Sequence, residues 1–132
     1  MATTIDLLPH RAPWLLVDRV VARDASSVVV HKLLGANDPL LADGTLPELL
    51  VLEALAQAAA CLQTEALGRH RGWLVAVSQF EVHDRAHAGE TLALRAVREA
   101  TMGRLHRVSG AASVGERAIA SAQMTFALED VA

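Results

Sequence analysis

A long apolar segment from Leu46 to Leu62 is the feature that most constrains the fold of this chain. As a helix it would be apolar on nearly every side, and such a helix must be enclosed by other parts of the protein. Glu53 and Gln57 interrupt the apolar run, so burial in a protein core is a better interpretation than a membrane span. A buried carboxyl group must be neutral, paired or used, because desolvation disfavours its charged form. Glu53 is therefore the first candidate for a catalytic residue.

Local signals predict that this segment is helical. Thr45 and Glu48 have the spacing of a capping box, and Pro47 lies in the first turn, where its missing N–H costs little. Gly68 supplies a stop signal. Between these signals lie about 21 residues, or roughly 30 Å of helix. Many of them are alanines, so other backbone can approach this thin helix closely.

The chain on both sides of the helix consists of β-branched runs separated by turn signals. Asp24-Ala25 separates the first two runs as in a hairpin, and each later break contains a glycine. The predicted strands are residues 14–23, 26–34, 73–83, 91–101, 104–113 and 117–128. Nothing in this order requires parallel crossovers, so the sequence predicts an α+β domain with an antiparallel sheet. One long central helix wrapped by one curved antiparallel sheet is the hot-dog fold.

Length and composition limit the possible partners. With 132 residues the chain is predicted to be a single domain over residues 1–132. Its net charge of −3, without a basic run and with few aromatic residues, argues against nucleic-acid binding. The first residues lack the basic and apolar regions of a signal peptide, so we expect a cytoplasmic protein. The single cysteine, Cys61, is predicted to fill the core.

Two separated motifs are distinctive: residues 8–20 (LPHRAPWLLVDRV), and residues 52–58 (LEALAQA) after Leu46-Pro47. They resemble the 3-hydroxyacyl-(acyl carrier protein) dehydratases of fatty-acid synthesis, which share the opening segment and the Leu-Glu-Ala-hydrophobic-Ala-Gln signature of the central helix. Residues 80–90 resemble a later strand and a Pro-Gly-Asp turn of that family. The loop at residues 42–47 is similar to that of dehydratase-like proteins from polyene and polyketide-type assembly.

The resemblance implies a dimer with active sites at the subunit interface. In that family a histidine in the loop before the helix removes the α-proton of a 3-hydroxyacyl thioester, and the helix glutamate of the other protomer handles the departing hydroxyl. Elimination needs such a base and such an acid, with backbone N–H groups at the helix start polarising the thioester carbonyl. Glu53 falls on the family's carboxylate and is the candidate acid.

Leu46 and Pro47 at the helix start, and Gln57 one turn after Glu53, are assigned to substrate binding. The predicted substrate is a thioester of an acyl carrier protein or of coenzyme A. No cofactor, metal or membrane partner is predicted.

The family's histidine has no counterpart in this chain. Counted back from Glu53 without gaps, the Gly-His-Phe-Pro motif falls on residues 38–41 (DPLL), and no histidine occurs between His31 and His70. The candidates for a replacement base in this loop are Asp38 and, as a weak candidate, Asp43. Both positions also have the chemistry of a turn, and an aspartate with the usual pKa of about 3.9 is a weaker base than imidazole.

The other histidines are assigned no catalytic role. His10 is interpreted as architectural and His31 as a half-exposed strand residue. His83 and His87 straddle a strand end and a turn, so they do not form a zinc pair. His70 and His106 are predicted to lie on the surface.

Three functions follow from these residues. The first is a dehydratase-like subunit that supplies the carboxylate half of a site, beside a hot-dog paralogue that keeps the histidine. The second is a self-sufficient hot-dog dehydratase or acyl thioesterase, acting as a homodimer, in which Asp43 or Glu53 activates substrate or water. The third is a non-catalytic subunit that binds an acyl chain or a carrier protein.

Overall fold

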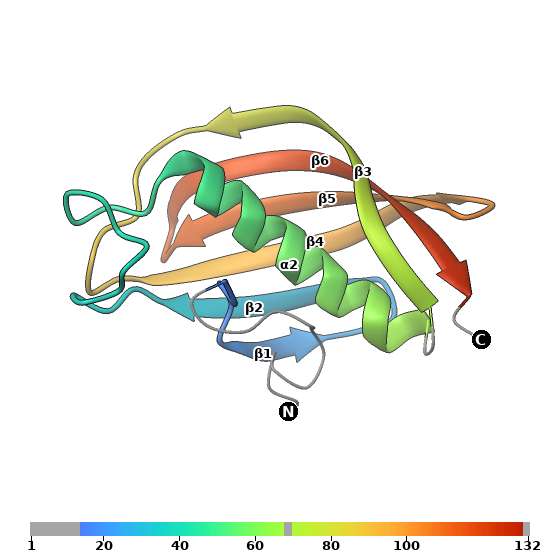
Figure 1. The fold of residues 1–132 in the computed structure, drawn as a ribbon, viewed down its shortest axis with the longest axis horizontal. Helices are drawn as coiled ribbons and strands as arrows, with labels where there is room; N and C mark the ends of the chain where they lie inside the picture. Colours follow the sequence, from blue (N-terminus) through green and yellow to red (C-terminus); the bar gives the residue numbers. More distant parts are fainter. Residues whose placement is uncertain (1–13, 68–69, 131–132) are drawn as a thin grey trace.

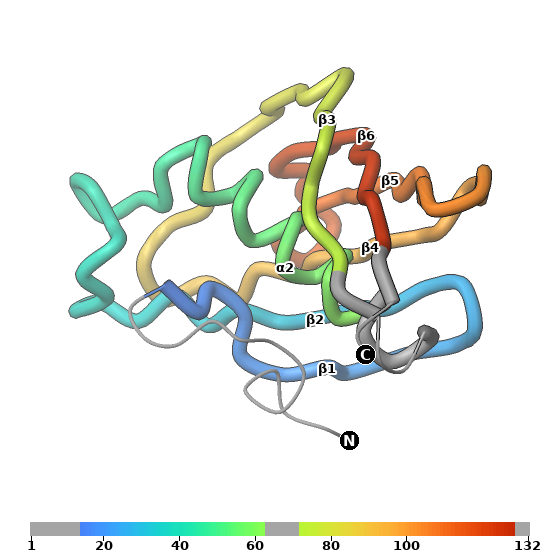
Figure 2. The backbone as a smooth tube through the Cα atoms, turned by 45° about the vertical axis from the view of Figure 1, so that its right-hand side comes forward, coloured from blue at the N-terminus to red at the C-terminus, as the bar shows by residue number. Residues whose placement is uncertain are grey.

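A computed structural model of the protein describes residues 14–67 and 70–130. These residues form one helix and six strands: β1 (Arg19–Arg23), β2 (Ser27–Leu33), α2 (Glu48–Leu67), β3 (His70–Val82), β4 (Thr91–Met102), β5 (Leu105–Val114) and β6 (Arg117–Asp130). The strands form one antiparallel sheet in the order β1-β2-β4-β5-β6-β3. The sheet curves around α2, as the two views in Figure 1 and Figure 2 show. The predicted arrangement of one helix wrapped by a curved antiparallel sheet is confirmed.

The first predicted strand is shorter than expected. Its residues 14–18 are not in a strand, because Trp14 and Leu16 hydrogen-bond to the side chain of Gln57 in α2 rather than to a neighbouring strand. The predicted turn at Asp24-Ala25 is confirmed: the Asp24 carboxylate accepts hydrogen bonds from the backbone N–H groups of Ser26 and Ser27, each at 2.8 Å.

The helix starts without the predicted capping box. The carbonyl of Pro47 accepts the first helical hydrogen bonds, from the N–H groups of Leu50 and Val51, so Pro47 precedes the helix. The Thr45 hydroxyl donates to the Ala42 carbonyl at 3.0 Å and belongs to a separate turn. The capping-box prediction is therefore wrong, and Gly68 lies outside the described residues.

The core lies between α2 and the concave face of the sheet. Ala54, Leu55 and Ala58 of the helix are fully buried against it. Gly110 of β5 lets the two layers approach, because a Cβ atom there would lie 2.9 Å from Met124 Cε and 3.3 Å from Leu55 Cδ2. Across residues 14–67 and 70–130, no helix has the length and apolar character needed to cross a membrane.

Gly110→Val is expected to lower the free energy of unfolding by about 1–3 kcal/mol, because the added carbons crowd the contact between helix and sheet. Chemical denaturation followed by circular dichroism measures this change. The matched control is Ala111→Val, the next residue of β5, whose side chain is exposed. It should change stability by no more than about 0.5 kcal/mol. Equal stabilities of the two variants would contradict the close approach at Gly110.

Candidate active site

Glu53 lies on the side of α2 that the chain's own sheet does not cover. Its side chain is exposed, although the next residues, Ala54 and Leu55, are fully buried. Leu49, one turn earlier, is 74% exposed. The expectation that Glu53 is a buried carboxylate in the protein core is therefore wrong for the structure of the single chain. The helix is apolar on nearly all sides, but the sheet of one chain encloses only part of it.

Gln57 is buried one turn after Glu53, with 1% of its surface exposed. Its Oε1 accepts a hydrogen bond from the Leu16 N–H at 2.8 Å. Its Nε2 donates to the Trp14 carbonyl at 2.8 Å and to Glu53 Oε1 at 3.2 Å. Both donors of the amide are thus used. Within one chain, Gln57 ties the segment before β1 to the helix and orients the Glu53 carboxylate, so its amide is not open to a substrate.

A pocket of about 380 Å³ lies at the start of α2, lined by Ala42, Asp43, Thr45, Leu46, Pro47, Glu48, Leu49 and Arg85. The structure thus brings two residues assigned to substrate binding, Leu46 and Pro47, to one pocket. The first-turn N–H groups of Glu48 and Leu49 have no carbonyl acceptor within the helix, and the helix dipole places partial positive charge there. Glu53 follows about 8 Å further along the helix axis.

Asp43 lies at the tip of a tight turn. The backbone groups of Ala42 and Thr45 exchange two hydrogen bonds, of 2.8 and 3.0 Å, around Asp43 and Gly44. Both central residues have positive φ, 52° and 75°, as a type I′ turn requires. The interpretation of Asp43-Gly44 as a turn is confirmed. Asp43 also lines the pocket at the start of α2.

Asp38 forms an ion pair that the sequence reasoning missed. Its Oδ2 lies 3.0 Å from Nζ of Lys32, a lysine that is only 5% exposed. Burial alone would raise the pKa of Asp38, but hydrogen bonds from the Leu40 N–H and from Lys32 outweigh it and hold the pKa below its ordinary value. The signal for Lys32 was its place in the inward-facing series of β2, after Val28 and Val30.

Asp38 and Lys32 also line a second pocket, of about 500 Å³, together with Leu15 and the loop residues 35–37 and Pro39. Pro39 is the position on which the family's histidine falls. An ion-paired aspartate with a lowered pKa is a poor proton acceptor, so this loop has no good base beside that position.

The histidines of the described residues lie in different parts of the fold. His31 is half-buried in β2, as predicted, and His83 and His87 are exposed. His106 is only 7% exposed, so its prediction as a surface residue is wrong. It belongs to the inward-facing series of β5 with Val108 and Gly110. His10 and the side chain of His70 lie outside the described part of the structure.

No group of three or more His, Cys, Asp or Glu side chains among the described residues could hold a metal ion.

Strand β3 is an edge strand with exposed apolar side chains. Residues 72–79 are all exposed, including Trp73 at 46% and Val75 at 49%. Because successive side chains of a strand point to opposite faces, β3 is uncovered on both. An exposed apolar edge strand is a template for pairing with another chain. Strand β3 and the part of α2 that carries Leu49 and Glu53 are thus both left uncovered by the rest of the described chain.

Known proteins match the sequence of this chain over nearly its full length. A family model of ApeP-like proteins, described as ApeP dehydratase, matches residues 3–130. The 3-hydroxyacyl-(acyl-carrier-protein) dehydratase FabZ of Chlamydia caviae is 33% identical over 138 residues, covering 96% of this chain and 89% of the relative.

Solved structures share the fold. A chain of the dehydratase heterocomplex ApeI:P from Xenorhabdus doucetiae has a TM-score of 0.84 at 19% identity, over 98% of this chain and 93% of that chain. A hypothetical thioesterase with coenzyme A from Streptococcus pneumoniae has a TM-score of 0.73 at 15% identity, over 85% of both chains. The family match and the FabZ identity establish that this chain belongs to the ApeP-like dehydratase family, with the hot-dog fold and FabZ among its relatives.

Proposed function

We propose that this chain is one half of a 3-hydroxyacyl-thioester dehydratase, in which it supplies Glu53 and a second hot-dog chain supplies the histidine. One observation carries the proposal: Glu53 is oriented by Gln57 on an uncovered apolar face, while residues 32–69 contain no histidine. The names of the relatives support the reaction, and the heterocomplex named for the ApeI:P structure supports two different chains.

The two aspartates of the loop are poor replacements for the histidine. Asp38 is committed to Lys32 and to the Leu40 N–H, which lower its pKa. Asp43 lies at the tip of a type I′ turn, where its positive φ favours an aspartate for structural reasons. Each site of a homodimer would therefore contain Glu53 but no histidine to remove the α-proton. A heterodimer with a histidine-bearing chain would contain one complete site.

In the proposed reaction the partner's histidine removes a proton from the α-carbon of the thioester. The electrons of that C–H bond form the double bond between the α- and β-carbons. The bond from the β-carbon to the hydroxyl oxygen breaks, and Glu53 gives its proton to that oxygen, so that water leaves. Proton transfer by a positioned side chain contributes typically 10²- to 10⁴-fold to such a step.

The pocket at the start of α2 is the proposed place of the thioester carbonyl. Negative charge develops on that oxygen as the α-proton leaves, and the N–H groups of Glu48 and Leu49 are donors at the positive end of the helix dipole. Leu46 and Pro47 form the apolar wall beside it. The substrate would be a thioester of an acyl carrier protein or of coenzyme A.

Gln57 is proposed to position Glu53 rather than to contact the substrate. Its hydrogen bond to Glu53 Oε1, at 3.2 Å, restricts the orientation of the carboxylate on the exposed side of α2. Its remaining bonds, to Trp14 and Leu16, hold the amide in place. The Gln57 amide thus links the backbone of Trp14 and Leu16, before β1, to the position of the Glu53 carboxyl group.

Dehydration should require a partner. The purified chain alone is expected to leave a 3-hydroxyacyl-carrier thioester unchanged, and addition of a histidine-bearing hot-dog chain should yield the enoyl thioester, measured as loss of water by mass spectrometry. Glu53→Gln in this chain should lower the rate of the mixture by at least about 10²-fold. Glu116→Gln, in the exposed turn after β5, is the control and should keep the rate.

Turnover by the chain alone would contradict the composite site and favour a self-sufficient enzyme. Release of free thiol without dehydration would indicate a thioesterase. Absence of turnover with every histidine-bearing partner would contradict the proposed dehydratase function and would favour a non-catalytic subunit that binds an acyl chain or a carrier protein.

Gln57→Leu should lower kcat of the mixture at least about tenfold with little change in KM, because Glu53 loses its orienting donor. The Leu16 N–H would also lose its acceptor, at a cost of about 1–3 kcal/mol in unfolding free energy. Steady-state kinetics and denaturation measure the two effects. A raised KM with unchanged kcat would instead indicate that Gln57 contacts the substrate, which is the role predicted for it from the sequence.

The uncovered face should be the surface that binds the partner. Val75→Lys in β3 is expected to weaken association at least about tenfold, because the charge must be desolvated in the interface. Leu33→Lys is a matched control, since Leu33 is an exposed apolar residue of β2, four strands away from β3 in the sheet. Sedimentation analysis of the mixtures measures association. Equal weakening by both variants would contradict this assignment.

A further inference from the structure

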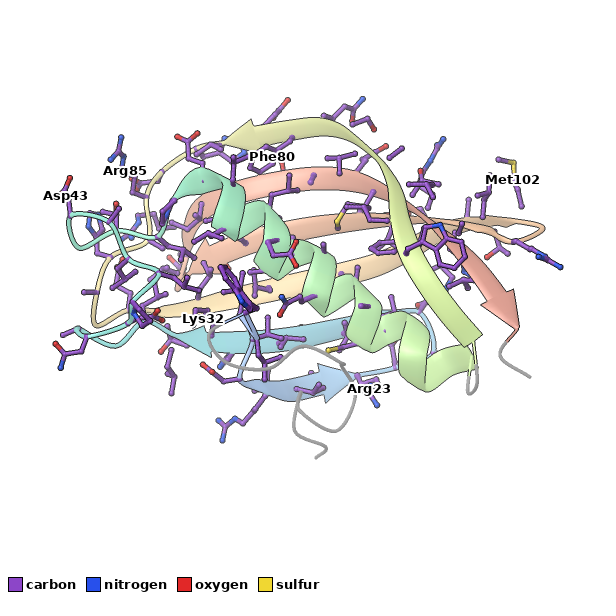
Figure 3. All side chains as sticks on the ribbon, viewed as in Figure 1. Arg23, Lys32, Asp43, Phe80, Arg85 and Met102 are labelled. Atoms are coloured by element: carbon purple, nitrogen blue, oxygen red, sulfur yellow. The ribbon has the colours of Figure 1, made fainter. Side chains whose placement is uncertain are left out.

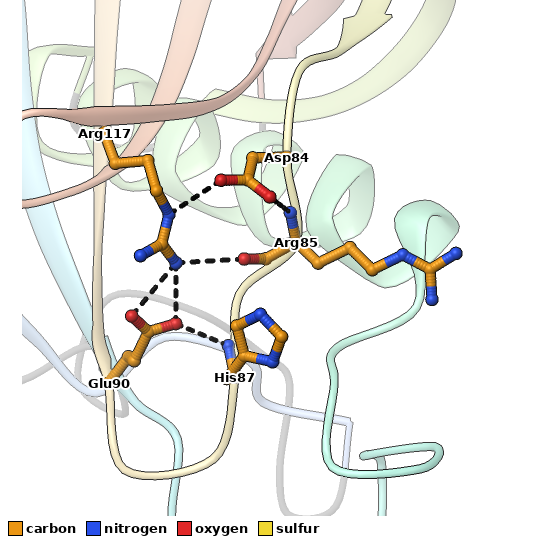
Figure 4. Close-up of polar contacts among 5 residues, drawn as sticks. All are labelled: Asp84, Arg85, His87, Glu90 and Arg117. Carbon is orange, nitrogen blue, oxygen red and sulfur yellow. Dashed lines mark hydrogen bonds and ion pairs between the residues drawn. The ribbon is translucent and has the colours of Figure 1, made fainter.

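The loop between β3 and β4 is cross-linked by one arginine from a distant strand. Arg117, the first residue of β6, places Nε 2.9 Å from Asp84 Oδ2 and Nη2 2.8 and 3.0 Å from the two carboxylate oxygens of Glu90. Nη2 also donates to the carbonyl of Arg85 at 3.0 Å. Figure 4 shows the guanidinium group between the two carboxylates and this carbonyl. Arg117 thus fixes both ends of the segment 84–90 and one peptide inside it.

The two carboxylates in turn bind the loop backbone. Asp84 Oδ1 accepts from the Arg85 N–H at 2.7 Å, and Glu90 Oε1 accepts from the His87 N–H at 2.7 Å. Arg117 therefore determines the backbone path of the loop through charged acceptors that each make a second, local hydrogen bond. Hydrogen bonds with an ionised partner are shorter and stronger than neutral ones.

The loop held in this way forms the support for the start of α2. The Leu46 N–H donates to the carbonyl of Ala86 at 3.0 Å, and the Ala88 N–H donates to the carbonyl of Gly44 at 2.8 Å. Ala86 is fully buried at this contact. The side chain of Arg85 lines the same pocket as Leu46, and in Figure 3 both Arg85 and Asp43 lie at the end of the molecule where α2 begins.

We propose that Arg117 is a positioning residue for the substrate pocket at the start of α2, acting through the loop 84–90. The inference rests on the proposed function, because it assigns the thioester end of the substrate to this pocket. Within the part of the chain that the structure describes, the hydrogen bond from Arg117 to the lining of the pocket goes to the Arg85 carbonyl, so we expect its effect to pass through the loop backbone. Exposed ion pairs contribute little to global stability, so the effect on the pocket should exceed the effect on folding.

The ion pair between Glu90 and Arg117 is fully formed at neutral pH, because Glu90 is ionised there. The hydrogen bond from Arg117 is the largest cause that lowers the pKa of Glu90 below its ordinary value of 4.5. A carboxyl group with a lowered pKa contributes stability above its ordinary value and loses it as the pH falls through the lowered one. The groups that face Glu90 are Arg117 and His87, and Asp84 lies on the other side of the guanidinium.

The test compares Arg117→Gln and Arg117→Lys with the control variant Arg95→Gln. Arg95 is an exposed arginine of β4, outside the loop 84–90. Amide hydrogen exchange of the chain alone is measured first, because it needs no activity. Exchange at Leu46 and Ala88 should be at least about tenfold faster in Arg117→Gln and intermediate in Arg117→Lys, which keeps the charge but not the forked geometry. The amide of Val108 in β5, and all amides of the control, should exchange as in the natural chain.

Steady-state kinetics of the mixture with a histidine-bearing partner form the second measurement. Arg117→Gln should raise KM for the acyl thioester about fivefold or more, with kcat changed less than KM, because the pocket and not Glu53 is displaced. Unchanged exchange at Leu46 and Ala88 would overturn the inference, and so would faster exchange with unchanged KM. If the natural chain turns over with no partner, the proposed function fails, while the exchange result still decides whether Arg117 holds the start of α2.

Discussion

The enclosure of an apolar helix by a sheet that can cover only part of it is the constraint on which this structure depends. Residues such as Leu55 and Ala58 enter the core, and Gly110 lets the sheet approach them. The remaining side of α2 keeps Leu49 exposed and carries Glu53 next to buried neighbours. A carboxylate on an otherwise apolar surface is costly to cover unless a partner or a substrate compensates its charge. The exposure of the candidate acid and the exposure of Leu49 thus have the same origin, which is the part of α2 that the chain's own sheet leaves uncovered.

The described structure separates three roles that are close in sequence. Gln57 orients the carboxylate, the start of α2 offers backbone donors, and the loop before it is stabilised by Lys32 and Asp38 instead of bearing a base. The ion pair of the loop needs Asp38 ionised, and the hydrogen bonds from the Leu40 N–H and from Lys32 hold the pKa of Asp38 below its ordinary value.

Patterns of apolar residues predicted the elements well, because helix and strand periods differ and glycines mark the turns. They could not tell which face of α2 belongs to the chain's own core, since a residue covered by a partner and a residue covered by the same chain look alike in sequence. This is why Glu53 was expected to be buried. Residues 14–18 were predicted as strand from their apolar run. The hydrogen bonds that hold Trp14 and Leu16 to Gln57 leave no local signal in the sequence, because they join positions more than 40 residues apart. His106 was misplaced because it stands next to the charged Arg107, although its alternation with Val108 and Gly110 places it in the inward-facing series of β5.

The exposed edge of β3 has a consequence for the protein in the cell. A chain with Trp73 and Val75 open to water can pair with any strand that it meets, including that of a misfolded copy. Cells degrade or hold proteins whose apolar surface stays open, so surplus copies would have short lifetimes. If a second chain covers this edge, as the proposed function requires, the abundance of this chain would follow the supply of that partner, and the cell would need to synthesise the two chains in balance.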